Sequence, residues 1–420
     1  MSPAADLATG TNFPEPGDVM SPEEKLASQA EPEALEELTS DGEGAGLEAE
    51  KEEGAIHAPF DPEKIDVITQ ARTVDLLLTR LREGELDLSP EFQRRSNVWN
   101  EMRKSALIES MLLRIPIPSL YVSEDKEGNY TVVDGLQRLC AISHFIDVAA
   151  LNKAAKVKLN PLRLQSLESL KEYVGKTFAE MPRPLQRRIS ETELTLHIIR
   201  ASTPSNVKFN IFSRINQGGL PLTAQEIRNA VYPGEWRIRV RRLAESDLFL
   251  KATENKIKGE RMQDIELVLR FVAHYTLQPN EKRPDDQNLD DFLNDTVEKR
   301  SGQWGEDRWK DIESAFASAL QAAPRVFGRV AFRKYSSPEH YRLPINRGLF
   351  ETESVALAWR SKDELEVLAK RSDLVIKKFA EHYAVDSEFS NALLYATGRG
   401  RASKKRIEVI GGILDEVLRA

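Results

Sequence analysis

The chain has 420 residues, of which 40% are hydrophobic and 30% charged, a balance typical of folded globular proteins. This length exceeds a single compact core and predicts two or three packed units. The one cysteine, Cys140, excludes an internal disulfide, and no apolar run approaches the ~18 residues that a membrane-spanning helix needs. The N-terminus has no basic-then-apolar leader, so the expected location is the cytoplasm, with no membrane partner.

The charge is unevenly distributed along the chain. Residues 1–55 contain 15 Asp and Glu against two Lys, a net charge of −13, whereas the whole chain has −8 and the remainder therefore +5. An acidic segment rich in Glu, Ala, Gly and Pro buries too little apolar surface to fold, so we expect residues 1–58 to form a disordered tail. A solubilising extension is the simplest function for it, and competition with nucleic acid for a basic face is the alternative.

From residue 65 the pattern becomes that of a folded unit. Thr73 can cap a helix that Gly84 ends, and two prolines make residues 115–118 extended. The other expected elements are strands at 86–88, 120–122, 130–133 and 194–199, and helices at 100–113, 139–146, 206–216 and 224–231.

Beyond residue 260 the pattern predicts helices almost throughout. Apolar residues recur at helical spacing over 265–272 and 312–320, and the last helix is expected from about 406 to 418. We therefore expect an α+β fold, with a small mixed sheet and helices over 60–235 and an all-helical part over 236–420.

The sequence Asp134-Gly135-Leu136-Gln137-Arg138 combines features that suit an anion. A predicted strand ends here, Gly135 leaves the backbone open to a ligand, and the helix that follows offers unpaired amides and a positive dipole end. Arg138 supplies a charged fork for phosphate oxygens, and Gln137 can donate to phosphate or orient a water. Asp134 is a candidate Mg²⁺ ligand or base. The alternative interpretation is a turn glycine beside a solvent-exposed Gln-Arg pair.

Two further polar segments are candidates for phosphate contacts. Gln93 and Arg94 follow a strand and a proline on an irregular segment, where the alternative is a basic pair on the surface. Arg214 and Asn216 lie at the expected C-terminus of a helix beside two glycines, where a helix cap is the simpler account.

Six motifs occur in the order found in the N-terminal domain of the GmrSD-type modification-dependent restriction proteins, a branch of the ParB/sulfiredoxin-like superfold, and resemble that domain. They are Pro90-Glu91-Phe92-Gln93-Arg94, Val98-Trp99, Ile108-Glu109-Ser110-Met111-Leu112, Ile115-Pro116-Ile117-Pro118, Val133-Asp134-Gly135-Leu136-Gln137-Arg138-Leu139 and Arg214-Ile215-Asn216-Gln217-Gly218-Gly219. The resemblance covers about residues 70–275, and the helical remainder is also similar to single-domain members. The family signature is Asp-Gly-Gln-Gln-Arg, so Leu136 removes one polar contact here. The resemblance implies nucleotide binding and hydrolysis at this motif, coupled to DNA restriction in defence against phage.

Motifs for other chemistry do not fit. His340 and His382 are isolated, so we expect no HNH nuclease unit and a stand-alone member of the family. Gly175-Lys176-Thr177 is not a P-loop, because Leu170 stands where that motif needs Gly. Without a Cys-His cluster a zinc site is not expected, and both Cys140 and His144 are interpreted as packing residues.

The first functional hypothesis is therefore an NTP-binding and NTP-hydrolysing protein with Mg²⁺ as candidate cofactor. Asp134 would position the metal or a water and Gln137 would orient that water. Arg138, with Gln93 and Arg94, would clamp the phosphates. On this hypothesis Arg138→Ala weakens nucleotide binding without unfolding the protein.

Two other hypotheses stay open. One is a DNA-binding adaptor that works with a separately encoded nuclease, using a flexible basic loop before the last helix whose candidate phosphate contacts are Arg399, Arg401, Lys404 and Lys405. The other is a nuclease activity of the ParB-like domain itself.

Overall fold

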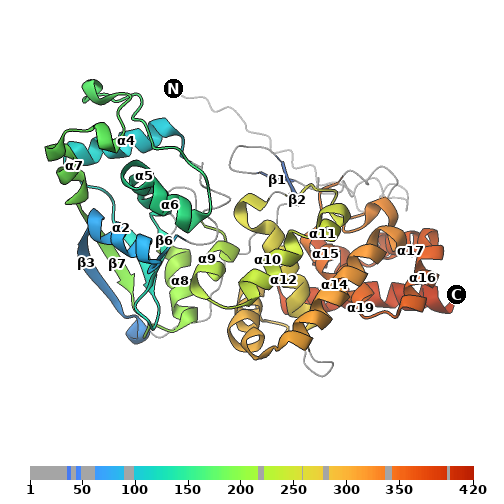
Figure 1. The fold of residues 1–420 in the computed structure, drawn as a ribbon. Coiled ribbons are helices and arrows are strands. Elements are labelled where there is room, and N and C mark those ends of the chain that lie inside the picture. The colour runs from blue at the N-terminus through green and yellow to red at the C-terminus, as the bar shows by residue number, and fades with distance from the viewer. Residues whose placement is uncertain are drawn as a thin grey trace, which may run out of the picture.

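The structure is a computed structural model that describes residues 36–38, 44–48, 62–88, 99–215, 222–257, 259–277, 283–335, 343–394 and 398–420. Figure 1 shows the sheet and the helices around it as one lobe, and the helices of the C-terminal half as a second lobe beside it. The α+β class, with a mixed sheet followed by a helical part, is thereby confirmed. None of the described helices combines the length and the apolarity needed to cross a membrane.

The first lobe is built on a five-stranded sheet in the order β3-β7-β5-β6-β4. The strands are β3 Val67–Thr73, β4 Leu86–Asp87, β5 Leu120–Glu124, β6 Tyr130–Asp134 and β7 Glu193–Ile199. β5 runs parallel to β7 and antiparallel to β6, with Leu120 beside Leu196 and Tyr121 beside Asp134. The starts of β5 and β7 therefore meet the end of β6, at what we call the Asp134 end of the sheet.

The first hydrophobic core lies between this sheet and the helices of the lobe. They are α2 Val74–Glu83, α4 Glu101–Leu112, α5 Leu136–Ile146, α6 Val148–Ala155 and α7 Arg183–Ser190. Alternate residues of β7, beginning with Leu194 and Leu196, enter the core as the strand period requires. The predicted limits of α2 are confirmed, because the Thr73 side chain accepts the Leu76 amide and Gly84 ends the helix with a φ of 80°.

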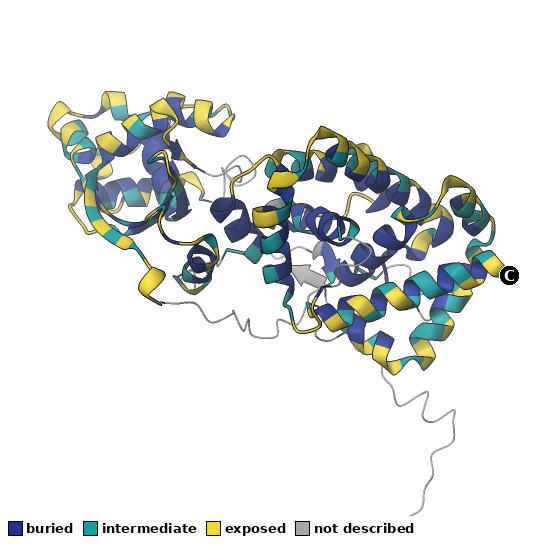
Figure 2. Cartoon of the chain, turned by 90° about the horizontal axis from the view of Figure 1, so that it is seen from below, coloured by how far each residue is buried: buried dark blue, intermediate teal, exposed yellow. Residues whose placement is uncertain are grey.

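The second lobe consists of helices packed around a second core. These are α8 Ser205–Ile215, α9 Ala224–Val231, α10 Trp236–Ala244, α11 Asp247–Ala252, α12 Gln263–Tyr275, α13 Leu289–Asp295, α14 Glu306–Val326, α15 Arg347–Ala358, α16 Lys362–Lys370, α17 Ser372–Val385, α18 Ser387–Leu394 and α19 Gly400–Arg419. Short helical turns are Pro62–Lys64, Lys171–Tyr173, Phe178–Glu180, Gly259–Arg261, Thr296–Arg300, Ser301–Gln303 and Gly328–Val330. Figure 2 shows a buried interior in each lobe, with the exposed residues on the outer turns.

Strand β6 belongs to both cores. Val132 packs in the first core, whereas its neighbour Val133 packs in the second, to which Phe209 of α8 and Ile227 of α9 also belong. Since β6 ends at Asp134, the strand that carries this residue is held from both faces.

A buried arginine ties α9 to the second lobe. Arg228 has no exposed surface, and its guanidinium donates to Gln225, to Asn294 of α13 at 2.8 Å and to Asp290 at 2.6 Å. Removing one partner from such a buried charge network is strongly destabilising, so α9 and α13 are held as one unit.

Part of the acidic N-terminal segment has defined partners. β1 Glu36–Leu38 and β2 Gly44–Glu48 form an antiparallel pair, and the Glu48 amide donates to the Ile345 carbonyl at 2.9 Å. Leu47 is fully buried in the second core, and Lys334 forms an ion pair with Glu48. The composition of residues 1–58 predicts no such element, because the partners of β2 lie almost three hundred residues further along the chain.

The expectation of a flexible basic loop before the last helix is wrong, because α19 begins at Gly400 rather than near Arg406. A Cβ at Gly400 would lie 1.9 Å from the Pro284 carbonyl oxygen, so only glycine permits this approach. The amides of Gly400 and Arg401 donate to carbonyls of the 284–287 loop, both at 3.1 Å. That loop caps the helix and orders the segment.

Candidate functional site

The predicted motif forms a sharp strand-to-helix turn at the Asp134 end of the sheet. β6 stops at Asp134, Gly135 adopts a left-handed conformation with a φ of 90°, and α5 begins at Leu136. A Cβ on Gly135 would lie 2.0 Å from Cδ2 of Leu120 on the adjacent strand. Glycine is therefore required twice, by its backbone angle and by the close approach of Leu120.

The first turn of α5 receives no side-chain cap from its N-cap residue. Gly135 is the N-cap and provides no side-chain hydrogen bond to the amides of that turn. An 11-residue helix with such a start places a partial positive charge beside the Asp134 carboxylate. Gln137 lies half-buried in this turn.

Arg138 forms structural hydrogen bonds that its position in the sequence does not predict. Its Nη1 donates to the carbonyls of Pro118 and of Ser119, the latter at 3.0 Å, and its Nη2 donates to Oδ2 of Asp134 at 2.9 Å. The side chain is only 14% exposed. Three of its five N–H donors thus fix the segment before β5 and the carboxylate of the motif.

Asp134 remains accessible while Arg138 holds it. Its side chain is 41% exposed, and the bond from Arg138 engages Oδ2. Among the residues that the structure describes, no group of three or more His, Cys, Asp or Glu could hold a metal. An Mg²⁺ ion at Asp134 would take its other ligands from water and phosphate, which is the usual coordination of Mg²⁺ in phosphate-binding sites.

Among the described residues, four of the predicted site residues come together. Asp134, Gly135, Gln137 and Arg138 share one turn. Arg214 is an exposed residue in the last turn of α8. The remaining candidates, Gln93, Arg94 and Asn216, fall outside the described residues.

Another motif of the family resemblance has a structural role. Glu109 of α4 is 6% exposed, and its carboxylate accepts the amides of Glu168, Ser169 and Leu170 at 2.8–3.1 Å. Burial would raise the pKa of Glu109, but these backbone hydrogen bonds outweigh it and lower the pKa. Glu109 therefore anchors the 168–170 loop as a carboxylate.

The residues interpreted as packing residues are buried as predicted. Cys140 and His144 lie on the inner face of α5, 3% and 4% exposed. His144 Nε2 lies 2.8 Å from the Asn160 carbonyl, so this nitrogen is the donor and Nδ1 accepts from Lys104 Nζ at 3.5 Å. Burial lowers the pKa of His144 and raises that of Cys140, so both stay neutral.

Two of the four candidate DNA contacts near the C-terminus are neutralised within the fold. Arg401 pairs with Glu388 at 3.1 Å, and Lys405 pairs with Asp386 at 2.9 Å. Lys404 is exposed on α19, and Arg399 is the N-cap of that helix. Paired cations release fewer counterions on binding DNA, so this segment offers little support for a DNA interface.

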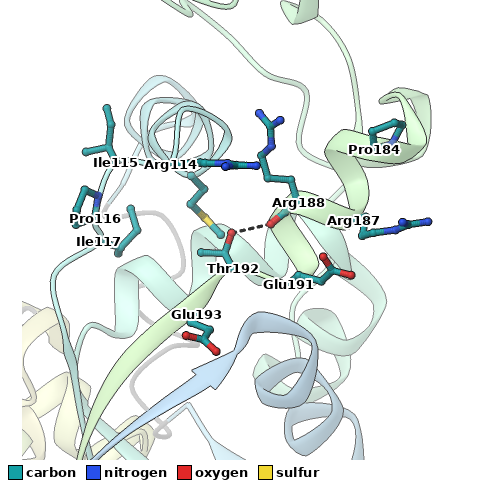
Figure 3. Close-up of a pocket in the computed structure, with 11 residues that line it drawn as sticks. Arg114, Ile115, Pro116, Ile117, Pro184, Arg187, Arg188, Glu191, Thr192 and Glu193 are labelled. Carbon is teal, nitrogen blue, oxygen red and sulfur yellow. Dashed lines mark hydrogen bonds between the residues drawn. The ribbon is translucent and has the colours of Figure 1, made fainter.

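A cavity of about 530 Å³ opens at the Asp134 end of the sheet, between the end of α4 and α7 (Figure 3). It is lined by Met111, Arg114, Ile115, Pro116, Ile117, Pro184, Arg187, Arg188, Glu191, Thr192 and Glu193. The sequence contains Ile115–Pro118 as a family motif, but nothing local associates it with residues 184–193. The packing of α4 against α7 brings these two segments together.

Residues 75–233 match the family described as GmrSD restriction endonuclease, N-terminal domain. The matched span begins in α2, ends just after α9, and includes both the Asp134 turn and the cavity. No curated protein and no solved structure gave a significant match. The chain therefore carries a GmrSD restriction endonuclease N-terminal domain, as the order of its motifs predicted.

Proposed function

We propose that the protein binds and hydrolyses a nucleoside triphosphate at the Asp134–Arg138 turn, as part of a DNA restriction system that defends against phage. The observation that carries this proposal is the uncapped start of α5 at Gly135, directly beside a half-exposed carboxylate. Backbone amides at a helix start bind phosphate, and a negative charge there interacts favourably with the helix dipole.

Each residue of the turn has a role in this proposal. Phosphate oxygens lie against the first turn of α5. Asp134 orients the attacking water, and Gln137 assists it as a hydrogen-bond partner. A bound Mg²⁺ would supply charge neutralisation at the phosphates. Arg138 holds Asp134 in place and retains two N–H donors for a phosphate oxygen.

The test is phosphate release from each of the four NTPs with magnesium, combined with thermal unfolding. We expect hydrolysis of at least one NTP. A ligand present at a hundred times its dissociation constant should raise the free energy of unfolding by about 2.7 kcal/mol. If no NTP is hydrolysed and none raises the melting temperature, the proposal is wrong. Plasmid nicking in the absence of nucleotide, abolished by Asp134→Ala, would instead assign the domain a nuclease activity.

A further inference from the structure

Arg114 occupies a backbone position that normally belongs to glycine. The Ile115 amide donates to the Ser110 carbonyl at 2.9 Å and the Arg114 amide to the Met111 carbonyl at 3.1 Å. This is the Schellman arrangement at the end of α4, with Arg114 at its left-handed position and a φ of 62°. An arginine there is strained relative to glycine, and such strain concentrates at functional sites.

The strained residue places its guanidinium at the cavity defined above. In Figure 3 the side chains of Arg114 and Arg188 extend over the same end of the cavity, and Glu193 lies at the other end. Arg188 donates one hydrogen bond, to the Leu112 carbonyl at 3.0 Å. Among the described residues no carboxylate forms an ion pair with either arginine. Glu191 and Glu193 also line the cavity, but among the described residues neither is paired with these two arginines, so both guanidinium groups can attract an anion.

The cavity and the Asp134 turn share a structural support. Since Leu120 lies beside Leu196, continuing the two parallel strands backwards brings Ile117 level with Glu193. Arg138 donates to the carbonyls of Pro118 and Ser119, the residues that directly follow this cavity wall. Arg188 holds the other end of the same wall through Leu112. The motif arginine therefore shapes the cavity.

We propose that Arg114 and Arg188 bind phosphate groups of the nucleotide, so that the cavity, and not Arg138 alone, selects the triphosphate. The inference rests on the proposed function. Two guanidinium forks suit phosphate oxygens, and Ile115, Pro116 and Ile117 provide an apolar surface for sugar and base. The volume of about 530 Å³ is in the range of small-ligand sites. Glu193 is placed to accept hydrogen bonds from hydroxyl or amino groups.

Arg114→Gly gives a test in which binding and stability move in opposite directions. We expect the affinity for the hydrolysed NTP, measured by calorimetry, to fall about 10-fold or more, because a charge-assisted hydrogen bond is lost. The melting temperature should rise, because glycine relieves the left-handed strain. Arg114→Asn, which tolerates the same backbone angle, separates loss of charge from added flexibility. Arg183→Ala, an exposed arginine of α7 outside the cavity, is the charge-matched control.

The outcomes separate this inference from the proposed function. Weaker NTP binding in both Arg114 variants, unchanged binding in Arg183→Ala, and competition by inorganic tripolyphosphate in the wild type support the phosphate site. Equal NTP affinity in all variants overturns it and leaves the proposed function standing. Loss of NTP binding without competition by tripolyphosphate overturns the phosphate assignment. If the wild type binds no NTP, the proposed function itself fails.

Discussion

Arg138 Nη2 donates to Asp134 Oδ2 across 2.9 Å, so two polar residues of one motif bind each other one helical turn apart. The same guanidinium also donates hydrogen bonds to the carbonyls of Pro118 and Ser119. Arg138 is therefore a positioning residue for both the carboxylate and the cavity wall. These contacts predict that removing Arg138 also lowers stability, beyond the loss of nucleotide affinity expected from the sequence.

Arg138→Ala should lower both stability and nucleotide affinity. Loss of the hydrogen bonds from a mostly buried guanidinium should reduce the free energy of unfolding by about 2–3 kcal/mol, or roughly 5–10 °C in melting temperature. Arg138→Lys should retain only part of the stability and of the nucleotide affinity, because one ammonium group cannot replace a planar guanidinium fork. Chemical denaturation and NTP titration of both variants measure this. Unchanged stability in Arg138→Ala would show that the three contacts contribute nothing.

Gly135→Ala should disrupt the turn, and Gly84→Ala is its matched control. Both glycines are left-handed, with φ of 90° and 80°, so each substitution carries a strain of about 1 kcal/mol. Only Gly135 has a close neighbour, Leu120, whereas nothing lies within 4 Å of a Cβ at Gly84. The overlap should add about 1–3 kcal/mol of destabilisation. Adding Leu120→Ala to Gly135→Ala should relieve part of the overlap. Equal losses of stability in Gly135→Ala and Gly84→Ala would refute this account.

Asp134→Asn should abolish NTP hydrolysis while the fold persists. The amide oxygen can still accept from Arg138, so the free energy of unfolding should change by no more than about 1 kcal/mol. The negative charge is lost, and the rate of phosphate release should fall about 100-fold or more if Asp134 orients the attacking water. Asp75→Asn, at an exposed position in the first turn of α2, is the control. Wild-type hydrolysis in Asp134→Asn would remove this residue from the mechanism.

A buried network in the second lobe should make stability depend on pH. Glu351 accepts from Ser403 at 2.8 Å and from Arg406 at 2.9 Å, and His274 lies 3.4 Å away. Burial lowers the pKa of His274 from 6.5 to about 4. Burial would raise the pKa of Glu351, but His274 and the arginines around it lower that pKa from 4.5 to about 2.

Both lowered pKa values make the folded protein less stable as the pH falls. Between pH 6.5 and about 4 the unfolded chain binds a proton at His274 that the folded chain excludes, so stability falls as the pH falls. The Glu351 contribution is complete above pH 4.5 and is lost as the pH falls towards 2. Chemical denaturation across this range should show both phases, and His274→Gln should remove the upper one. A wild-type profile that is flat from pH 6.5 to 4 would contradict the lowered pKa of His274.

The Asp134 turn could be predicted from the sequence because it depends on neighbours along the chain. A β-strand, a glycine and a helix start are local features, and the order of the motifs identified the family. The helical second lobe was predictable for the same reason, since helical periodicity is read from residues three and four apart.

The roles of the individual charged residues were decided by tertiary structure. Arg138 meets Pro118 and Ser119 because β5 and β6 are neighbours, and Arg114 meets Arg188 because α4 packs on α7. Lys405 reads as a DNA contact in the sequence but pairs with Asp386 in the fold. A charged side chain has the same local signal whether it binds a ligand or a distant partner in its own chain, and only the packing of elements far apart in sequence selects between the two.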